Sequence, residues 1–170
     1  MEFNGLLPKL PKPVRLFLVA FVIVLSVGYF TGLLFVSETS TASVDGIEEN
    51  YLGNESDENA DVMKFKKSKR QMLTIIHTHI LSMSFIFFLL GILVWLTKLP
   101  TKLKVFLTVE PFLSVLLTFG GIYFIWSGVT WFKYLVIVSG ILMTATYTAS
   151  AMIVLYQLTF SKQYGNTFNQ

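Results

Sequence analysis

Four long stretches of the chain contain almost no charged side chain, and each is long enough to cross a lipid bilayer. Residues 16–37 and 134–161 contain no acidic or basic side chain. Residues 71–97 contain two histidines as their only such groups, and residues 105–132 contain a single glutamate. A helix that spans the hydrocarbon core needs about 20 predominantly apolar residues. The sequence therefore predicts four membrane-spanning helices.

The composition indicates one membrane domain rather than a soluble domain with an anchor. Hydrophobic residues make up 54% of the 170 residues, and the mean hydropathy is +0.65. Charged residues make up 14%, against about a quarter in soluble domains, and they cluster between the apolar stretches. We therefore expect an all-α protein, an integral membrane four-helix antiparallel bundle with one extracytoplasmic loop.

The connecting segments set the expected boundaries. Prolines near the N-terminus predict an extended lead-in, and the short connector before the third span predicts an antiparallel hairpin of spans two and three. The apolar core of the first span is longer than that of a signal peptide, so we expect it to be a spanning helix. The expected parts are a cytoplasmic lead-in at 1–13, transmembrane helices at 14–37, 71–98, 105–127 and 131–160, an extracytoplasmic loop at 38–70, a cytoplasmic turn at 99–104 and a cytoplasmic tail at 161–170.

The basic residues predict which ends face the cytoplasm. Lysine and arginine cluster at residues 9–15 and 98–104, and Lys162 follows the fourth span. These segments share one side of a four-span protein, and positively charged flanks favour the cytoplasmic side. A basic stretch at residues 64–70 lies on the opposite side and weakens this bias. We expect both termini in the cytoplasm and the protein in the lipid bilayer of a bacterial inner membrane. The basic residues thus indicate topology and no nucleic-acid binding.

The long connector changes its charge along its length. Residues 38–61 are rich in acidic and small polar side chains, whereas residues 64–70 are strongly basic. Because the acidic part has few apolar side chains to bury, we expect it to have little regular structure. Two interpretations stay open. The connector is either a docking surface for a charged partner or a solvated loop whose basic end anchors the second span at the lipid headgroups.

Small residues within two spans predict close contacts between helices. Gly28 and Gly32 form a Gly-x-x-x-Gly pair in the first span, and Gly140 and Thr144 are four residues apart in the fourth. Small side chains let helix backbones approach closely in lipid. We expect these four residues to pack against other helices, either of this chain or of another subunit.

Several chemistries are excluded by absence. The chain has no cysteine, which excludes disulfides, thiolate metal sites and cysteine catalysis. It also lacks a glycine-rich phosphate-binding loop and paired carboxylates on a helix face. We expect no enzymatic activity.

His77 and His79 are the first of three ionisable groups inside the apolar stretches. Two residues apart on a helix, they point about 200° away from each other, so one chain cannot wrap both around one iron. The stretch from His77 to Gly91 resembles the His-x-His helices of proteins related to the haem-binding subunit of haem–copper oxidases. Further histidines of that family are absent. The resemblance implies haem b ligation by His77 or His79, and it implies nothing about oxygen reduction.

Two other interpretations apply to the histidines. His79 shares a stripe with Met72 and Met83, and two thioethers with one imidazole are ligands suited to copper(I). Alternatively both histidines are neutral and hydrogen-bonded near the outer interface.

Glu110 is the third ionisable group and precedes Pro111 near the start of the third span. Acidic groups in spanning helices are used in proton relays. The histidines begin the second span and are expected on the opposite half of the bilayer, so the two sites cannot form one cluster. Glu110 therefore predicts a proton path, or else it pairs at the interface with Lys102 or Lys104.

These observations favour a non-enzymatic accessory subunit of a larger membrane assembly, such as a respiratory complex, that packs against other membrane subunits or itself. The alternatives are a haem b protein that transfers electrons and a proton or ion conductor that uses Glu110.

Overall fold

A computed structural model of the chain describes residues 3–38, 44–55 and 62–160. The expected tail at 161–170 and parts of the expected loop at 38–70 lie outside the described residues. The described chain is helical and contains no strand. Its elements are η1 (Leu7–Lys9), α1 (Lys12–Glu38), α2 (Val44–Leu52), α3 (Lys69–Leu96), α4 (Thr101–Trp126) and α5 (Phe132–Thr159).

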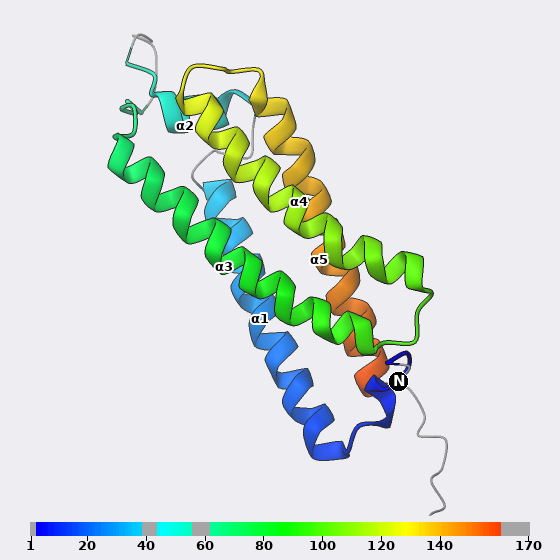
Figure 1. Cartoon of the computed structure of the whole chain (residues 1–170). Coiled ribbons are helices and arrows are strands. Elements are labelled where there is room, and N and C mark those ends of the chain that lie inside the picture. The colour runs from blue at the N-terminus through cyan, green and yellow to red at the C-terminus, as the bar shows by residue number, and fades with distance from the viewer. Residues whose placement is uncertain (1–2, 39–43, 56–61, 161–170) are drawn as a thin grey trace, which may run out of the picture.

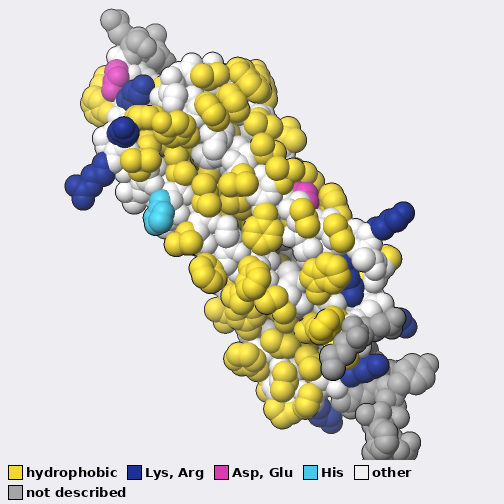
Figure 2. Space-filling model, viewed as in Figure 1, with side chains coloured by type: hydrophobic (Ala, Val, Ile, Leu, Met, Phe, Trp, Pro, Cys, Tyr) yellow, Lys and Arg dark blue, Asp and Glu magenta, His cyan; other side chains and the backbone are white. Residues whose placement is uncertain are grey.

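The four long helices lie side by side as a bundle (Figure 1). Each of them is long and apolar enough to cross a membrane. The space-filling view in Figure 2 shows apolar side chains over the middle of the face in view, with Lys and Arg side chains toward both ends. This distribution suits a bilayer, in which hydrocarbon surrounds the middle and headgroups surround the ends. The prediction of an all-α, four-span membrane bundle is confirmed.

The packing of the helices is uneven. α4 packs most extensively on α5 and next on α3, whereas α1 contacts mainly α5. Small side chains explain the closeness of the α4–α5 pair. A Cβ atom added at Gly121 would lie 2.7 Å from Cγ2 of Val136, so only glycine fits at this crossing.

Local sequence signals set the helix ends. α3 begins with a capping box, in which the Ser68 hydroxyl accepts from the Gln71 backbone N–H and the Gln71 side chain accepts from the Ser68 N–H. Pro100 precedes the first residue of α4 and has an extended conformation. Gly128 has a φ of 101°, a conformation that favours glycine, and it turns the chain from α4 toward α5.

The N-terminal lead-in differs from the expected extended segment. Residues Leu7–Lys9 form one turn of 3-10 helix, and the Leu7 side chain is fully buried. Pro8 fits in this first turn because its missing N–H is not needed there. The Gly5 N–H donates to the Thr97 carbonyl at 3.1 Å, which ties the lead-in to the connector between α3 and α4.

The acidic part of the long connector, residues 38–61, was expected to have little regular structure, and this expectation is wrong for residues 44–52. Residues Val44–Leu52 form α2, which contacts α4 and α5 at their connected end (Figure 1). The few apolar residues of this segment recur at helical spacing, so one face is enough to bury Ile47. Lys133 of α5 pairs with Glu48 at 2.9 Å and with Asp45 at 3.3 Å, which holds α2 over the bundle.

Candidate functional site

Buried polar side chains follow the contact between α4 and α5. On α5 and from Glu110 onward on α4 they recur at intervals of four or seven residues, which keeps them on the facing sides of the two helices. In a spanning bundle, polar groups that face the interior mark the places where function is sought. The set is Thr97, Lys104, Glu110, Ser114, Thr118, Ser139, Thr146, Ser150 and Gln157.

Glu110 is the acidic member of this set. It lies on α4, about 14 Å along the helix from its first residue, and only 9% of its surface is exposed. The Ser114 hydroxyl, one turn later, donates a short hydrogen bond to Oε1. The other oxygen, Oε2, is buried and has no hydrogen-bond partner among the described residues. A buried carboxyl with one unsatisfied oxygen is uncommon, because such a group usually costs free energy.

Glu110 has no cationic partner among the described residues. The expected pairing with Lys104 does not form, because its ammonium group donates to the Trp95 carbonyl at 2.7 Å and to Asn4 at 3.0 Å. The ion pairs of the described chain involve only Lys64 and Lys133, which lie at the other end of the bundle. Glu110 is thus a buried acidic group without a counter-charge in the described part of the chain.

Two tyrosines lie at the same level of the bundle. The hydroxyls of Thr118 and Ser139 bond across the antiparallel pair at 2.7 Å. Glu110 lies eight residues before Thr118 and Tyr147 lies eight residues after Ser139, so both are displaced toward the same end of the bundle and lie at the same level. Tyr147 is fully buried, and its ring stacks on that of Tyr29 with centroids 3.8 Å apart and planes at 3°. Tyr29 is also within electrostatic reach of Glu110.

The tyrosine hydroxyls link α1 to α5. The Tyr29 hydroxyl lies 3.3 Å from that of Thr144, and the Tyr147 hydroxyl lies 3.2 Å from that of Ser26. Neither tyrosine was predicted from the sequence as a candidate site residue. A signal was available, because tyrosines of membrane proteins concentrate at the interfaces and these two lie in the middle of their spans.

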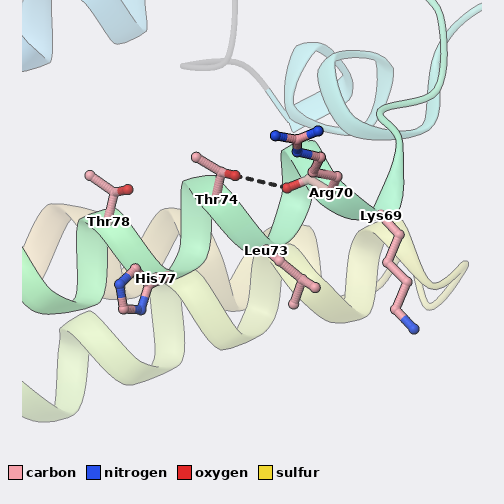
Figure 3. Close-up of a pocket in the computed structure, with 6 residues that line it drawn as sticks. All are labelled: Lys69, Arg70, Leu73, Thr74, His77 and Thr78. Carbon is pink, nitrogen blue, oxygen red and sulfur yellow. Dashed lines mark hydrogen bonds between the residues drawn. The ribbon is translucent and has the colours of Figure 1, made fainter.

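The two histidines are exposed on α3 and do not meet. The His79 ring packs against that of Phe119 of α4, with centroids 4.8 Å apart and planes tilted by 30°, and its Nδ1 lies 2.8 Å from the Ile75 carbonyl. His77 lies in a groove on the surface of α3 together with Lys69 and Arg70 (Figure 3). Because Phe119 is nine residues from Glu110 on α4, the histidine level and the carboxyl are about 14 Å apart along the bundle.

The structure limits which of the predicted haem and copper ligands can bind the same ion. A haem at His77 would have one axial ligand from this chain, since no other described histidine faces it. For copper, Met72 is fully buried and lies about 10 Å from His79 along the helix, so Met72, His79 and Met83 are too far apart to share one ion. No group of three or more histidine and acidic side chains in the described chain could hold a metal.

The predicted packing residues have free space around them. A Cβ atom at Gly28, Gly32 or Gly140 would meet nothing within 4 Å in this chain. Thr144 bonds to Tyr29 and to the Gly140 carbonyl. No described residue therefore approaches the three glycines closely, and their packing role stays a prediction.

Comparison with known proteins adds the family. No curated protein and no solved structure matches the chain. The Aq_1264_TM family model, described as a transmembrane helical domain, matches residues 41–165. The match begins after the last residue of α1 and contains α2 to α5, including the Glu110 site. The matched region is most of the chain, and the protein therefore belongs to this family of transmembrane helical domains.

Proposed function

We propose that this membrane protein transfers protons through Glu110. The observation that carries the proposal is the buried Oε2 atom, which has neither a hydrogen-bond partner nor a counter-charge among the described residues. Taking a carboxylate out of water without a partner is costly, and a bound proton removes that cost. The hydroxyl groups near Glu110 support the proposal, because hydroxyls both donate and accept hydrogen bonds.

The polar side chains suggest a route to both ends of the bundle. Ser114 and the bonded pair Thr118–Ser139 lead toward the α2 end. In the other direction Ser150 has a buried hydroxyl oxygen without a partner among the described residues, and Gln157 follows it near the opposite end. Water molecules between these groups would complete the route, as in other proton relays of membrane proteins.

A flux measurement tests this function. The purified protein is reconstituted into liposomes with a trapped pH-sensitive dye, and proton entry is driven by a potassium diffusion potential. We expect wild-type vesicles to acidify faster than empty vesicles. Glu110→Gln removes the titratable group while keeping its shape, and it should reduce the rate to that of empty vesicles.

Two controls sharpen the flux result. Glu38→Gln makes the same change at an exposed position at the end of α1, and it should leave the rate unchanged. Glu110→Asp keeps a carboxyl group and should retain part of the rate. The proposal fails if wild-type vesicles do not acidify faster than empty ones, or if Glu110→Gln conducts like the wild type.

The accessory-subunit role is the second candidate, and the open faces of Gly28 and Gly32 favour it. Small-xxx-small pairs in lipid are used where a second helix packs. Replacing both glycines by isoleucine should remove co-purifying membrane subunits or self-association without altering the secondary structure. Identical co-purification from the double variant and the wild type would exclude this surface.

Haem b binding stays a prediction from the resemblance, with His77 or His79 as the candidate ligand. An optical spectrum of the purified protein tests it directly. A reducible Soret band that disappears in His77→Ala or His79→Ala would establish haem ligation, and the absence of a band from the wild type would exclude it.

We also propose that both termini face the cytoplasm of a bacterial inner membrane. The basic residues that flank α1 and the α3–α4 connector support this orientation. Because the chain has no cysteine, Lys102→Cys and Ser127→Cys each create a unique label at opposite ends of α4. In intact spheroplasts an impermeant maleimide should label Ser127→Cys and not Lys102→Cys. The reverse pattern would invert the topology.

A further inference from the structure

We propose that the groove on the N-terminal part of α3 binds the headgroup of an anionic phospholipid. Lys69, Arg70, Leu73, Thr74, His77 and Thr78 line this groove, which Figure 3 shows in close-up. Two cations lie at the end of the groove near the first residue of α3, and apolar surface lies further along the helix. These two regions match the headgroup and the acyl chains of such a lipid. This site is independent of Glu110 and of proton transfer.

The residues form two stripes on the exposed side of α3. Lys69, Leu73 and His77 follow one another at intervals of four residues, and Figure 3 draws them on one side of the helix. Arg70, Thr74 and Thr78 form the neighbouring stripe with the same interval. The furrow between the stripes runs along the helix axis and therefore along the direction of an acyl chain.

The charges of the groove are uncompensated. Neither Lys69 nor Arg70 forms an ion pair with a described residue, whereas Lys64 and Lys133 do. A phosphate diester carries the complementary charge, and it accepts hydrogen bonds from both kinds of cation. Thr74 donates its hydroxyl to the Arg70 carbonyl at 2.9 Å, so the donor of this stripe that can reach the ligand is the guanidinium group of Arg70.

The depth of the groove fits a headgroup. Trp126 donates from its indole N–H to the Lys67 carbonyl at 2.7 Å, and Lys66 lies 5.5 Å from the centre of the same ring. Tryptophan marks the interface between hydrocarbon and headgroups in membrane proteins. Lys69 and Arg70 come two and three residues after Lys67, so their charges lie at the level of lipid phosphates.

The deeper part of the groove fits the rest of the lipid. His77 lies about 12 Å from Lys69 along the helix, which places it below the headgroup layer and beside the upper part of the acyl chains. Below it, Leu81 and Phe85 are exposed and continue the apolar surface. An anionic lipid thus finds cations at the level of its headgroup and an apolar track below them.

Native mass spectrometry of the detergent-purified full chain tests the site, with phosphatidylglycerol and phosphatidylcholine as the added lipids. We expect the chain to bind phosphatidylglycerol more tightly. The double variant Lys69→Gln/Arg70→Gln should weaken phosphatidylglycerol binding roughly tenfold or more, since each cation near a lipid surface contributes substantially, and should leave phosphatidylcholine binding unchanged.

Matched controls separate the groove from net charge. Lys98→Gln/Lys102→Gln removes two exposed cations at the other end of the bundle and should preserve the preference. His77→Ala keeps both groove cations and should retain the preference for phosphatidylglycerol. Glu110→Gln should bind lipid like the wild type, so failure of the proton function would not affect this result.

Three outcomes would overturn the proposal. The first is equal binding of the two lipids by the wild type. The second is an equal loss in both double variants, which would indicate a general effect of charge. The third is evidence that the groove binds a different ligand. Displacement of the lipid by millimolar inorganic phosphate would be such evidence, and so would the presence of haem at His77.

Discussion

The α4–α5 pair and α1 represent opposite ways in which a helix can belong to a membrane bundle. α4 and α5 each bury side chains on nearly every turn, including serine, threonine and glutamate. α1 is as long as its neighbours but buries only Val22 and Tyr29. It is also the helix that lies outside the family match. In lipid, polar and small side chains identify the core helices, because apolar side chains are equally stable against acyl chains and against protein.

The largest expected effect tests whether the centre of the bundle depends on one aromatic side chain. Tyr147→Ala removes a fully buried ring that contacts Tyr29 and Phe87, and it should lower the free energy of unfolding by about 3–5 kcal/mol. Titration with SDS, followed by circular dichroism, measures this change. The control Tyr156→Ala lies on the exposed face of α5 and should change stability little. Equal effects would mean that α5 is not buried as described.

The next effect concerns the crossing of α4 and α5. Gly121→Ala places a methyl group 2.7 Å from Val136 and should lower the free energy of unfolding by about 1–3 kcal/mol, because the helices must move apart. The adjacent Gly120→Ala is the matched control, since its Cβ atom meets nothing within 4 Å. The same unfolding titration distinguishes the two variants. A stable Gly121→Ala protein would contradict the close crossing.

A smaller effect is expected where α1 joins the pair. Tyr29→Phe removes the hydroxyl contact with Thr144 at 3.3 Å and should reduce stability by about 0.6 kcal/mol, the average for hydrogen bonds between spanning helices. Tyr123→Phe on the exposed side of α4 serves as the control. A loss of stability as large as that in Tyr147→Ala would show that α1 belongs to the core, like α4 and α5.

The smallest effect should come from the glycines of α1. Gly28→Ala and Gly32→Ala fill open space, so the monomer should keep its stability or gain up to about 1 kcal/mol per residue from helix propensity. Unfolding of the monomer in excess detergent measures this. Destabilisation of the monomer would reveal a helix contact within the chain at these positions.

The four spans could be predicted from sequence because a bilayer requires long apolar stretches, and charged side chains are excluded from them. α2 could not be predicted from the same rule. Its acidic composition suggested a disordered loop, whereas its stability comes from covering α4 and α5 and from Lys133, which is far away in the sequence. Composition describes a segment alone, and α2 depends on what lies beneath it.

The candidate site was predictable in part. Glu110 is conspicuous as the lone carboxylate of its span, and it was therefore predicted from the sequence as a candidate site residue. Its unsatisfied oxygen depends on Lys104 turning toward Trp95 and Asn4, which no local pattern specifies. The stacking of Tyr29 on Tyr147 likewise requires the docking of α1 on α5, and residues so distant in sequence meet only in the assembled bundle.

One contact at the end of the bundle has a consequence for how the chain is made. Arg15, at the start of α1, donates from its guanidinium group to the carbonyl of Leu158, near the end of α5, at 2.7 Å from Nε. A ribosome completes Arg15 long before it reaches Leu158. During synthesis α1 is therefore held in the bilayer by its hydrophobicity alone. The contact with α5 forms only after the last helix has left the insertion machinery.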